Sequence, residues 1–122
     1  MIVAGFGFRN RATADSLADA LELAAGELSV THFATASDKA TGPVFREFAA
    51  RCMMPVARVE AEDLKTQETL TKSSASARER GTGSLAEAAA LAAAGPGARL
   101  LVARVVSPDG FATCALAQGA QE

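Results

Sequence analysis

Near the start of the chain, Ile2-Val3-Ala4-Gly5-Phe6 forms a short apolar run with glycines at its end, Gly5 and the following Gly7. Such a run is typical of a buried strand. Thr13 then precedes an acidic turn and is suited to cap a helix. Apolar residues recur at helical spacing from Leu17 to Ala24, and Gly26 provides a helix stop. The first unit is therefore predicted to be a strand, a loop and a helix, which is the repeating unit of α/β proteins.

The same order of elements follows along the next part of the chain. A strand is predicted at Thr31–Ala36, followed by a polar loop at Ser37–Lys39 and a helix with its apolar face at Val44–Cys52. A third strand is predicted at 55–59, and a short helix at 61–65. Strands that alternate with helices indicate a sheet with helices on its faces.

The C-terminal half combines a polar segment, a helix and a hairpin. Residues 67–82 are polar and are expected to form a long loop. Ser84 and Glu87 have the spacing of a capping box for a helix over 85–94, whose many alanines allow neighbouring elements to pack close to it. Strands at 99–106 and 111–117 flank the turn residues Ser107-Pro108-Asp109-Gly110 and so predict a β-hairpin.

Together these elements predict a single-domain α/β fold over residues 1–122, with a mixed sheet of about five strands, helices on its faces and a C-terminal β-hairpin. A chain of 122 residues has room for one hydrophobic core, and 49% apolar with 21% charged residues is an ordinary globular composition. The formal net charge is −2, with both signs spread along the sequence, so no basic face for nucleic acid is expected.

The sequence contains no signal for a membrane or for secretion. The N-terminus lacks a basic segment followed by a long apolar run, so no signal peptide is expected. The longest apolar stretch, Leu85–Ala94, is too short to span a bilayer. Cys52 and Cys114 lie far apart without CxxC spacing and are interpreted as reduced, buried small residues. These observations predict a cytoplasmic protein that binds no membrane.

Three polar segments occupy positions where α/β proteins usually bind ligands, beyond the carboxyl ends of strands. Arginine offers forked donors for carboxylates, lysine offers a point charge, and a helix N-terminus offers free N–H groups to an anion. The sequence therefore predicts a pocket for a polyanionic small molecule; solvated surface charges and an ordinary helix cap are the alternative. The predicted binding residues are Gly7, Phe8, Arg9, Asn10, Arg11, Ser37, Lys39, Lys72, Gly81, Thr82, Gly83 and Ser84, with Phe8 as the aromatic ring available to a ligand.

Other functional signals in the sequence are weak. Gly5-Phe6-Gly7 begins like a dinucleotide fingerprint, but Asn10 occupies the third glycine position. The glycines are instead interpreted as serving a tight turn from strand to loop, where the backbone approaches something closely. His32, the only histidine, lies in or beside a strand and is expected to be structural. Because neither a Ser-His-acid order nor metal-ligand spacing is present, the catalytic residues stay unassigned and no metal or cofactor is expected.

Several segments, taken in order, match one known family. Gly5-Phe6-Gly7-Phe8-Arg9 is similar to a glycine-x-glycine-x-arginine start, and Ser37-Asp38-Lys39 is similar to a serine-x-x-lysine-like loop after the second strand. The segment from Ser84 to Leu91 resembles serine-valine-alanine-glutamate-alanine-alanine-alanine-leucine, and Ala115-Leu116-Ala117, with Thr113 before it, resembles the closing strand. On these segments, which cover essentially the whole chain, the sequence resembles the CbiG/CobE family.

The resemblance implies a role in building the corrin ring of vitamin B12. CbiG proteins are described as opening the lactone of cobalt-precorrin-5A and releasing a two-carbon fragment as acetaldehyde. This chain resembles the domain that ends those proteins, and hence the stand-alone CobE members, for which binding of a precorrin or hydrogenobyrinate-type tetrapyrrole as carrier or pathway partner is expected. Phe8 replaces the cysteine that the family usually has near the first loop, which puts a mechanism with a thiol at that place in doubt.

Two further functions are compatible with the same residues. A hydrolase acting on a ring lactone would use Arg9, Lys39 and Ser84 to polarise a carbonyl while water attacks. An interaction module for another enzyme of the pathway would instead need an exposed apolar patch. The lack of a convincing nucleophile or base favours binding over hydrolysis, so the expected partners are a precorrin or corrinoid and other cobalamin-pathway enzymes.

Overall fold

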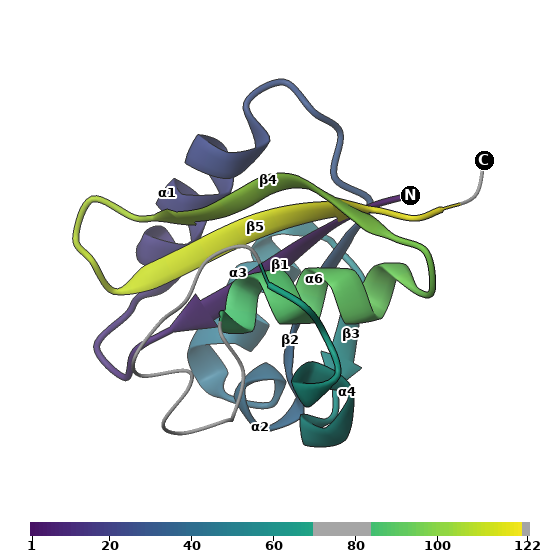
Figure 1. Ribbon diagram of the computed structural model, residues 1–122. Coiled ribbons are helices and arrows are strands. Elements are labelled where there is room, and N and C mark those ends of the chain that lie inside the picture. The colour runs from purple at the N-terminus through teal and green to yellow at the C-terminus, as the bar shows by residue number, and fades with distance from the viewer. Residues whose placement is uncertain (70–83, 121–122) are drawn as a thin grey trace.

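The fold is built on one five-stranded sheet, seen in a computed structural model that describes residues 1–69 and 84–120 (Figure 1). The strands lie in the order β3-β2-β1-β5-β4. Strands β1, β2 and β3 are parallel, whereas β5 is antiparallel to both of its neighbours. The predicted mixed sheet and C-terminal hairpin are therefore confirmed. The strand bounds are Ile2–Phe8 for β1, His32–Ala36 for β2, Val56–Val59 for β3, Arg99–Val106 for β4 and Ala112–Gln118 for β5.

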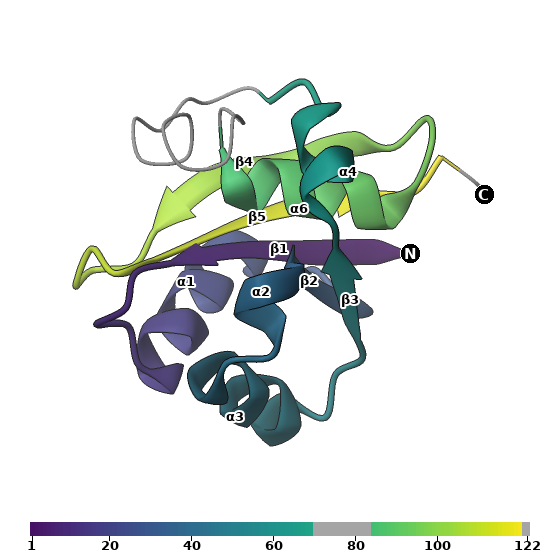
Figure 2. The same cartoon turned by 90° about the horizontal axis from the view of Figure 1, so that it is seen from below.

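Helices cover both faces of this sheet, as the view along its plane shows (Figure 2). On one face lie α1 (Ala14–Ala25) and α3 (Pro43–Cys52), and on the other lie α4 (Ala61–Lys65) and α6 (Leu85–Ala94). One further turn of helix, α2 (Ser37–Ala40), directly follows β2. The result is a three-layer arrangement in which each helix layer buries one face of the sheet.

The helix ends follow the capping signals in the sequence. The Thr13 side chain accepts a hydrogen bond from the backbone N–H of Ser16, and the Ser16 hydroxyl accepts one from the Thr13 N–H, which completes a capping box. Helix α1 ends at Gly26, whose φ of 53° lies in the region that favours glycine. At α6 the Ser84 side chain accepts from the Glu87 N–H, which is the serine half of the predicted capping box, whereas Glu87 Oε2 accepts from the Arg104 N–H.

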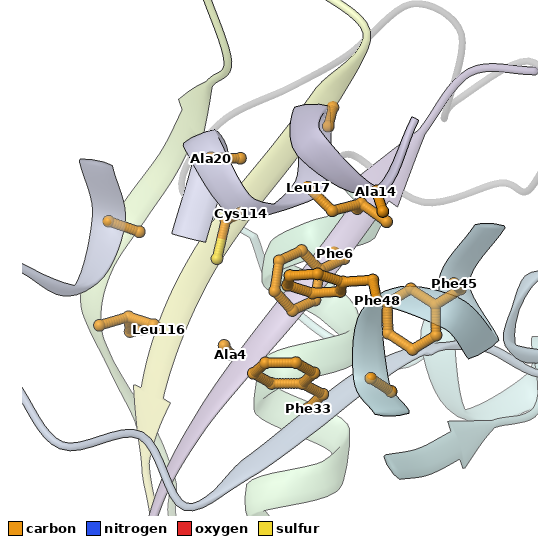
Figure 3. Packing of buried hydrophobic residues seen from close by; sticks show 13 residues of the cluster. Ala4, Phe6, Ala14, Leu17, Ala20, Phe33, Phe45, Phe48, Cys114 and Leu116 are labelled. Atoms are coloured by element: carbon orange, nitrogen blue, oxygen red, sulfur yellow. The ribbon is translucent and has the colours of Figure 1, made fainter. Parts of the chain in front are cut away.

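Four phenylalanines form the centre of the core under α1 and α3 (Figure 3). Phe6 contacts Phe33 and Phe48 edge to face, with ring centroids 5.1 and 5.3 Å apart. Phe33 and Phe48 stack with centroids 4.9 Å apart, and Phe45 completes the cluster. All four side chains are fully buried, so this aromatic cluster fixes α3 against the strands β1 and β2.

The opposite face of β1 is built for close helix packing. A Cβ atom added at Gly5 would lie 2.1 Å from the Ala86 carbonyl oxygen of α6. One added at Gly7 would lie 2.9 Å from the Thr113 hydroxyl of β5, and at an ordinary contact distance of 3.5 Å from the Leu85 Cβ. The prediction that the alanine-rich helix packs closely is confirmed. The interpretation of these glycines as a strand-to-loop turn is wrong, because both lie inside β1. The expected close approach is confirmed at Gly5, which gives room to α6, whereas at Gly7 the nearest neighbour is the Thr113 side chain of β5.

Two other local predictions differ from the structure. Residues Ser37–Lys39, expected as a loop, form the helical turn α2, where Asp38 in the first turn suits the helix dipole. Strand β1, expected to end at Phe6, continues to Phe8 because β5 pairs with it as far as the Phe8–Ala112 position. Most of the polar loop predicted at 67–82 lies outside the described residues.

The two cysteines have different surroundings. Cys114 lies in the core beneath α1, and burial raises the pKa of its thiol well above the usual range (Figure 3). Cys52 is only partly buried at the end of α3, and both side chains are free thiols. Across residues 1–69 and 84–120, no helix has the length and apolar character needed to cross a bilayer.

Candidate functional site

Those predicted binding residues that the structure describes lie toward one edge of the sheet, named here the carboxyl edge. The parallel strands β1, β2 and β3 all end there, β4 ends there and β5 begins there. Helix α6 also begins at this edge, since Leu85 lies against Gly7 whereas Ala94 lies near Gly119 at the far end of the sheet. In α/β sheets this edge is the usual place for a ligand site.

A single peptide unit, between Phe8 and Arg9, joins three segments of the carboxyl edge. Its carbonyl oxygen accepts a hydrogen bond of 2.6 Å from Lys39 Nζ. Its N–H donates a hydrogen bond of 2.8 Å to the Phe111 carbonyl oxygen. The end of β1, the α2 turn and the β4–β5 turn therefore meet at one point, and the first two predicted segments lie together.

Lys39 and Phe8 also interact through the aromatic ring. Lys39 Nζ lies 4.5 Å from the centroid of the Phe8 ring, a distance at which the ring attracts the ammonium group. The Phe8 ring itself is stacked against Phe45, with centroids 5.8 Å apart and an interplanar angle of 4°. Phe8 is therefore a half-buried ring with one side packed on α3, and Lys39 is held in place at the edge of the strand.

The two arginines lie on the exposed loop that follows Phe8. Arg9, Asn10 and Arg11 are all exposed. In the described part of the chain, neither guanidinium group has an ion-pair or hydrogen-bond partner. Their forked N–H donors are thus available for carboxylates from solution.

Asp109, which the sequence indicated only as a turn residue, accepts hydrogen bonds from residues next to both ends of the loop over residues 9–13, named here the arginine loop. One carboxylate oxygen accepts hydrogen bonds from the Ser107 hydroxyl and the Phe111 N–H, at 2.6 and 2.9 Å. The other oxygen accepts a 2.6 Å hydrogen bond from the hydroxyl of Ser16 in α1. These hydrogen bonds, with that from Ser107 first, lower the pKa of Asp109 below its ordinary value.

Glu87 is a second carboxylate with a position that the sequence does not reveal. It is fully buried, and its Oε2 accepts a 2.8 Å hydrogen bond from the Arg104 N–H. This N–H lies in the part of β4 where the pairing register with β5 shifts. The Glu87 side chain therefore supports the irregular strand beside the start of α6.

The remaining predicted residues occupy several environments. Ser84 is fully buried and caps α6, on the side of β1 opposite the Phe8 ring. Ser37 is the first residue of α2 and is partly buried. Lys72, Gly81, Thr82 and Gly83 lie outside the described residues.

No described residue adds an evident catalytic or metal centre to this edge. His32 lies at the start of β2, at the opposite edge of the sheet, and its Nδ1 is 2.8 Å from the Thr31 hydroxyl. Over residues 1–69 and 84–120, no group of three or more His, Cys, Asp or Glu side chains could hold a metal ion. The cationic groups of the carboxyl edge are one ammonium and two guanidinium groups, from Lys39, Arg9 and Arg11.

The fold and the carboxyl edge define a three-layer α/β domain with cationic side chains at the ends of its parallel strands. A family model described as the C-terminus of cobalamin synthesis protein G matches residues 2–117. The chain therefore belongs to this family of cobalamin-biosynthesis proteins, as the resemblance of its segments predicts.

Two solved structures support the family on the level of the whole fold. The first is CobE, a protein from the cobalamin (vitamin B12) biosynthetic pathway. This chain is similar to it at 33% identity and a TM-score of 0.84, over 96% of this chain and 89% of the other. The second is cobalamin biosynthesis protein chiG from Agrobacterium tumefaciens, at 32% identity and a TM-score of 0.75, over 99% of this chain and all of the other. No curated protein matches the sequence.

Proposed function

We propose that this cobalamin-biosynthesis protein binds a precorrin or hydrogenobyrinate-type tetrapyrrole at its carboxyl edge, as a carrier or pathway partner. The observation that carries the proposal is that the end of β1, the α2 turn and the β4–β5 turn meet at the Phe8–Arg9 peptide, where Lys39 donates to the Phe8 carbonyl oxygen. The next residue along the chain is the exposed Arg9, so a cationic residue directly follows the one that Lys39 contacts.

The chemistry of the proposed ligand fits these groups. Precorrins carry acetate and propionate carboxylates around a flat apolar ring. Lys39, Arg9 and Arg11 offer charge-assisted hydrogen bonds to such carboxylates. Phe8 is half-buried, with Phe45 stacked on its ring and Lys39 Nζ 4.5 Å from the ring centroid, and its exposed part offers apolar surface to the tetrapyrrole.

Binding is favoured over hydrolysis by the kinds of groups that the structure brings together. The cationic side chains at the carboxyl edge are hydrogen-bond donors, which hold a ligand without activating water. The carboxylates of Asp109 and Glu87 accept hydrogen bonds from within the protein, which gives each a structural role. The buried Cys114 has a raised pKa and His32 lies at the other end of β2, so neither is placed as a nucleophile or base at this edge.

A titration with hydrogenobyrinic acid, followed by visible absorption and calorimetry, tests the proposal. Wild-type protein is expected to bind stoichiometrically. Lys39→Ala should weaken binding about 10- to 100-fold, because a hydrogen bond to a charged group contributes about 1.5–3 kcal/mol. Arg9→Ala, at an exposed position, should weaken it about threefold.

Lys65→Ala is the matched control, since Lys65 is an exposed lysine in α4. It removes the same charge from a different part of the surface and should leave the affinity within about twofold of wild type. Equal losses for Lys39→Ala and Lys65→Ala would assign binding to net charge alone and would remove the carboxyl edge as the site.

Turnover separates this proposal from the hydrolase. Incubation of the protein with a lactone-bearing precorrin should leave the lactone closed while the ligand stays bound. Opening of the lactone at a rate proportional to protein concentration would replace the carrier function with an enzymatic one.

A further inference from the structure

Both ends of the arginine loop are connected to one carboxylate. At its start, the Arg9 N–H donates to the Phe111 carbonyl oxygen, and the Phe111 N–H donates to Asp109 Oδ1 at 2.9 Å. At its end, the Thr13 N–H donates to the Ser16 hydroxyl at 3.0 Å, and that hydroxyl donates to Asp109 Oδ2 at 2.6 Å. The two oxygens of Asp109 thus act on opposite ends of the same short loop.

This arrangement spans parts of the chain that are distant in sequence. Ser16 and Asp109 are separated by 93 positions, so the contact joins α1 to the β4–β5 turn. The turn itself is closed by a 2.9 Å hydrogen bond from the Gly110 N–H to the Ser107 carbonyl oxygen, and by the Ser107 hydroxyl on Asp109. Asp109 therefore sits on a rigid turn and holds a loop that has one internal backbone hydrogen bond, from the Ala12 N–H to the Arg9 carbonyl oxygen.

We infer that Asp109 is a positioning residue for anion binding, which holds Arg9 and Arg11 in the geometry that receives the ligand carboxylates. The inference rests on the proposed binding function and names a residue that touches no ligand. Its physical basis is preorganisation, because side chains on a fixed loop lose less freedom when they bind than side chains on a loose one.

The first test is hydrogen exchange on the free protein, which needs no ligand. Asp109→Ala should speed exchange of the Arg9 and Thr13 amides by about tenfold or more, while the Ala4 and Phe33 amides in the core keep their protection. Uniform acceleration at all four amides would show general destabilisation and would overturn the positioning role. Unchanged exchange at Arg9 and Thr13 would overturn it as well.

The second test is a double-mutant cycle in the binding of hydrogenobyrinic acid. Asp109→Ala should weaken binding about threefold in the wild-type background but less than about 1.5-fold in the Arg9→Ala/Arg11→Ala background. Equal losses in the two backgrounds would overturn the inference, because they would show that Asp109 acts independently of the arginines.

Two further variants make the cycle specific. Asp109→Asn keeps one carbonyl acceptor and should give an affinity between those of wild type and Asp109→Ala. Asp19→Ala is the matched control, because it removes an exposed carboxylate from α1 that is not part of the β4–β5 turn, and it should bind like wild type. If wild-type protein binds no hydrogenobyrinic acid, the proposed function fails for that compound, and the exchange experiment alone decides whether Asp109 holds the loop.

Discussion

Asp109 shows how a single surface residue acquires a defined role through its partners. The residue is exposed, yet its carboxylate accepts three hydrogen bonds, from Ser16, Ser107 and Phe111. Because hydrogen bonds to the charged form favour ionisation, the pKa of Asp109 lies below its ordinary value of 3.8. A carboxylate of this kind contributes stability that depends on pH.

The sign of that pH dependence follows from the direction of the shift. A group with a lowered pKa in the folded state stabilises the protein fully above its unfolded pKa, and this contribution is lost as the pH falls through the folded pKa. Wild type should therefore be more stable than Asp109→Asn at pH 7 to 5, with the difference shrinking below about pH 4. Urea unfolding midpoints across this range measure the difference. A gap that stays constant down to pH 3 would contradict the role of the ionised carboxylate.

The cysteines offer a second test at the level of single residues. Burial raises the pKa of the Cys114 thiol, so little reactive thiolate forms in the folded protein, whereas Cys52 is partly exposed. Iodoacetamide at pH 8 should label one thiol in the folded protein and both thiols in urea. The Cys52→Ser variant should resist labelling until it unfolds, and rapid labelling of the folded variant would contradict the buried environment of Cys114.

Among the elements, the contact between β1 and α6 depends most directly on one glycine. Alanine at Gly5 would place its Cβ 2.1 Å from the backbone oxygen of Ala86 and 2.9 Å from the Ala90 Cβ. Neither neighbour is a flexible side chain that can move aside, so α6 or β1 must shift. Gly5→Ala should lower the free energy of unfolding by at least about 2 kcal/mol, measured by urea denaturation.

Gly42→Ala is the matched control for this substitution. Gly42 caps α3 with a φ of −72°, and the nearest atom to an added Cβ is the Lys39 carbonyl oxygen at 3.4 Å. Its stability should stay within about 1 kcal/mol of wild type. If Gly5→Ala proves as stable as Gly42→Ala, close helix packing is not the reason for glycine at position 5.

Local elements of this fold could be predicted because their signals are carried by neighbouring residues. Thr13 and Ser84 cap α1 and α6 as expected, and the β4–β5 turn lies at Ser107-Pro108-Asp109-Gly110. The end of β1 was less predictable, because it depends on pairing with Ala112, more than a hundred residues later in the chain. The reason for Gly5 likewise lies in α6, and the closest neighbour of Gly7 is Thr113 in β5, rather than anything in the adjacent loop.

At the scale of the whole molecule, the residue types of the candidate site could be predicted from the sequence, but the hydrogen bonds between distant segments could not. The sequence indicates a cationic edge because Arg9, Arg11 and Lys39 follow the ends of strands. It does not indicate that Lys39 reaches back to Phe8, or that Asp109 bonds Ser16, because those contacts arise only when the sheet is assembled. The proposed binding and positioning therefore depend on contacts that exist only in the tertiary structure.

The most direct measurement of the central claim is a map of amide chemical shifts in ¹⁵N-labelled protein during titration with hydrogenobyrinic acid. The largest changes are expected at residues 8–12 and 37–41, on the carboxyl edge. The His32, Arg99 and Gly119 amides at the opposite edge of the sheet should move little. Changes concentrated at that opposite edge, or saturating binding with no change near Lys39, would contradict the assignment of the carboxyl edge as the ligand site.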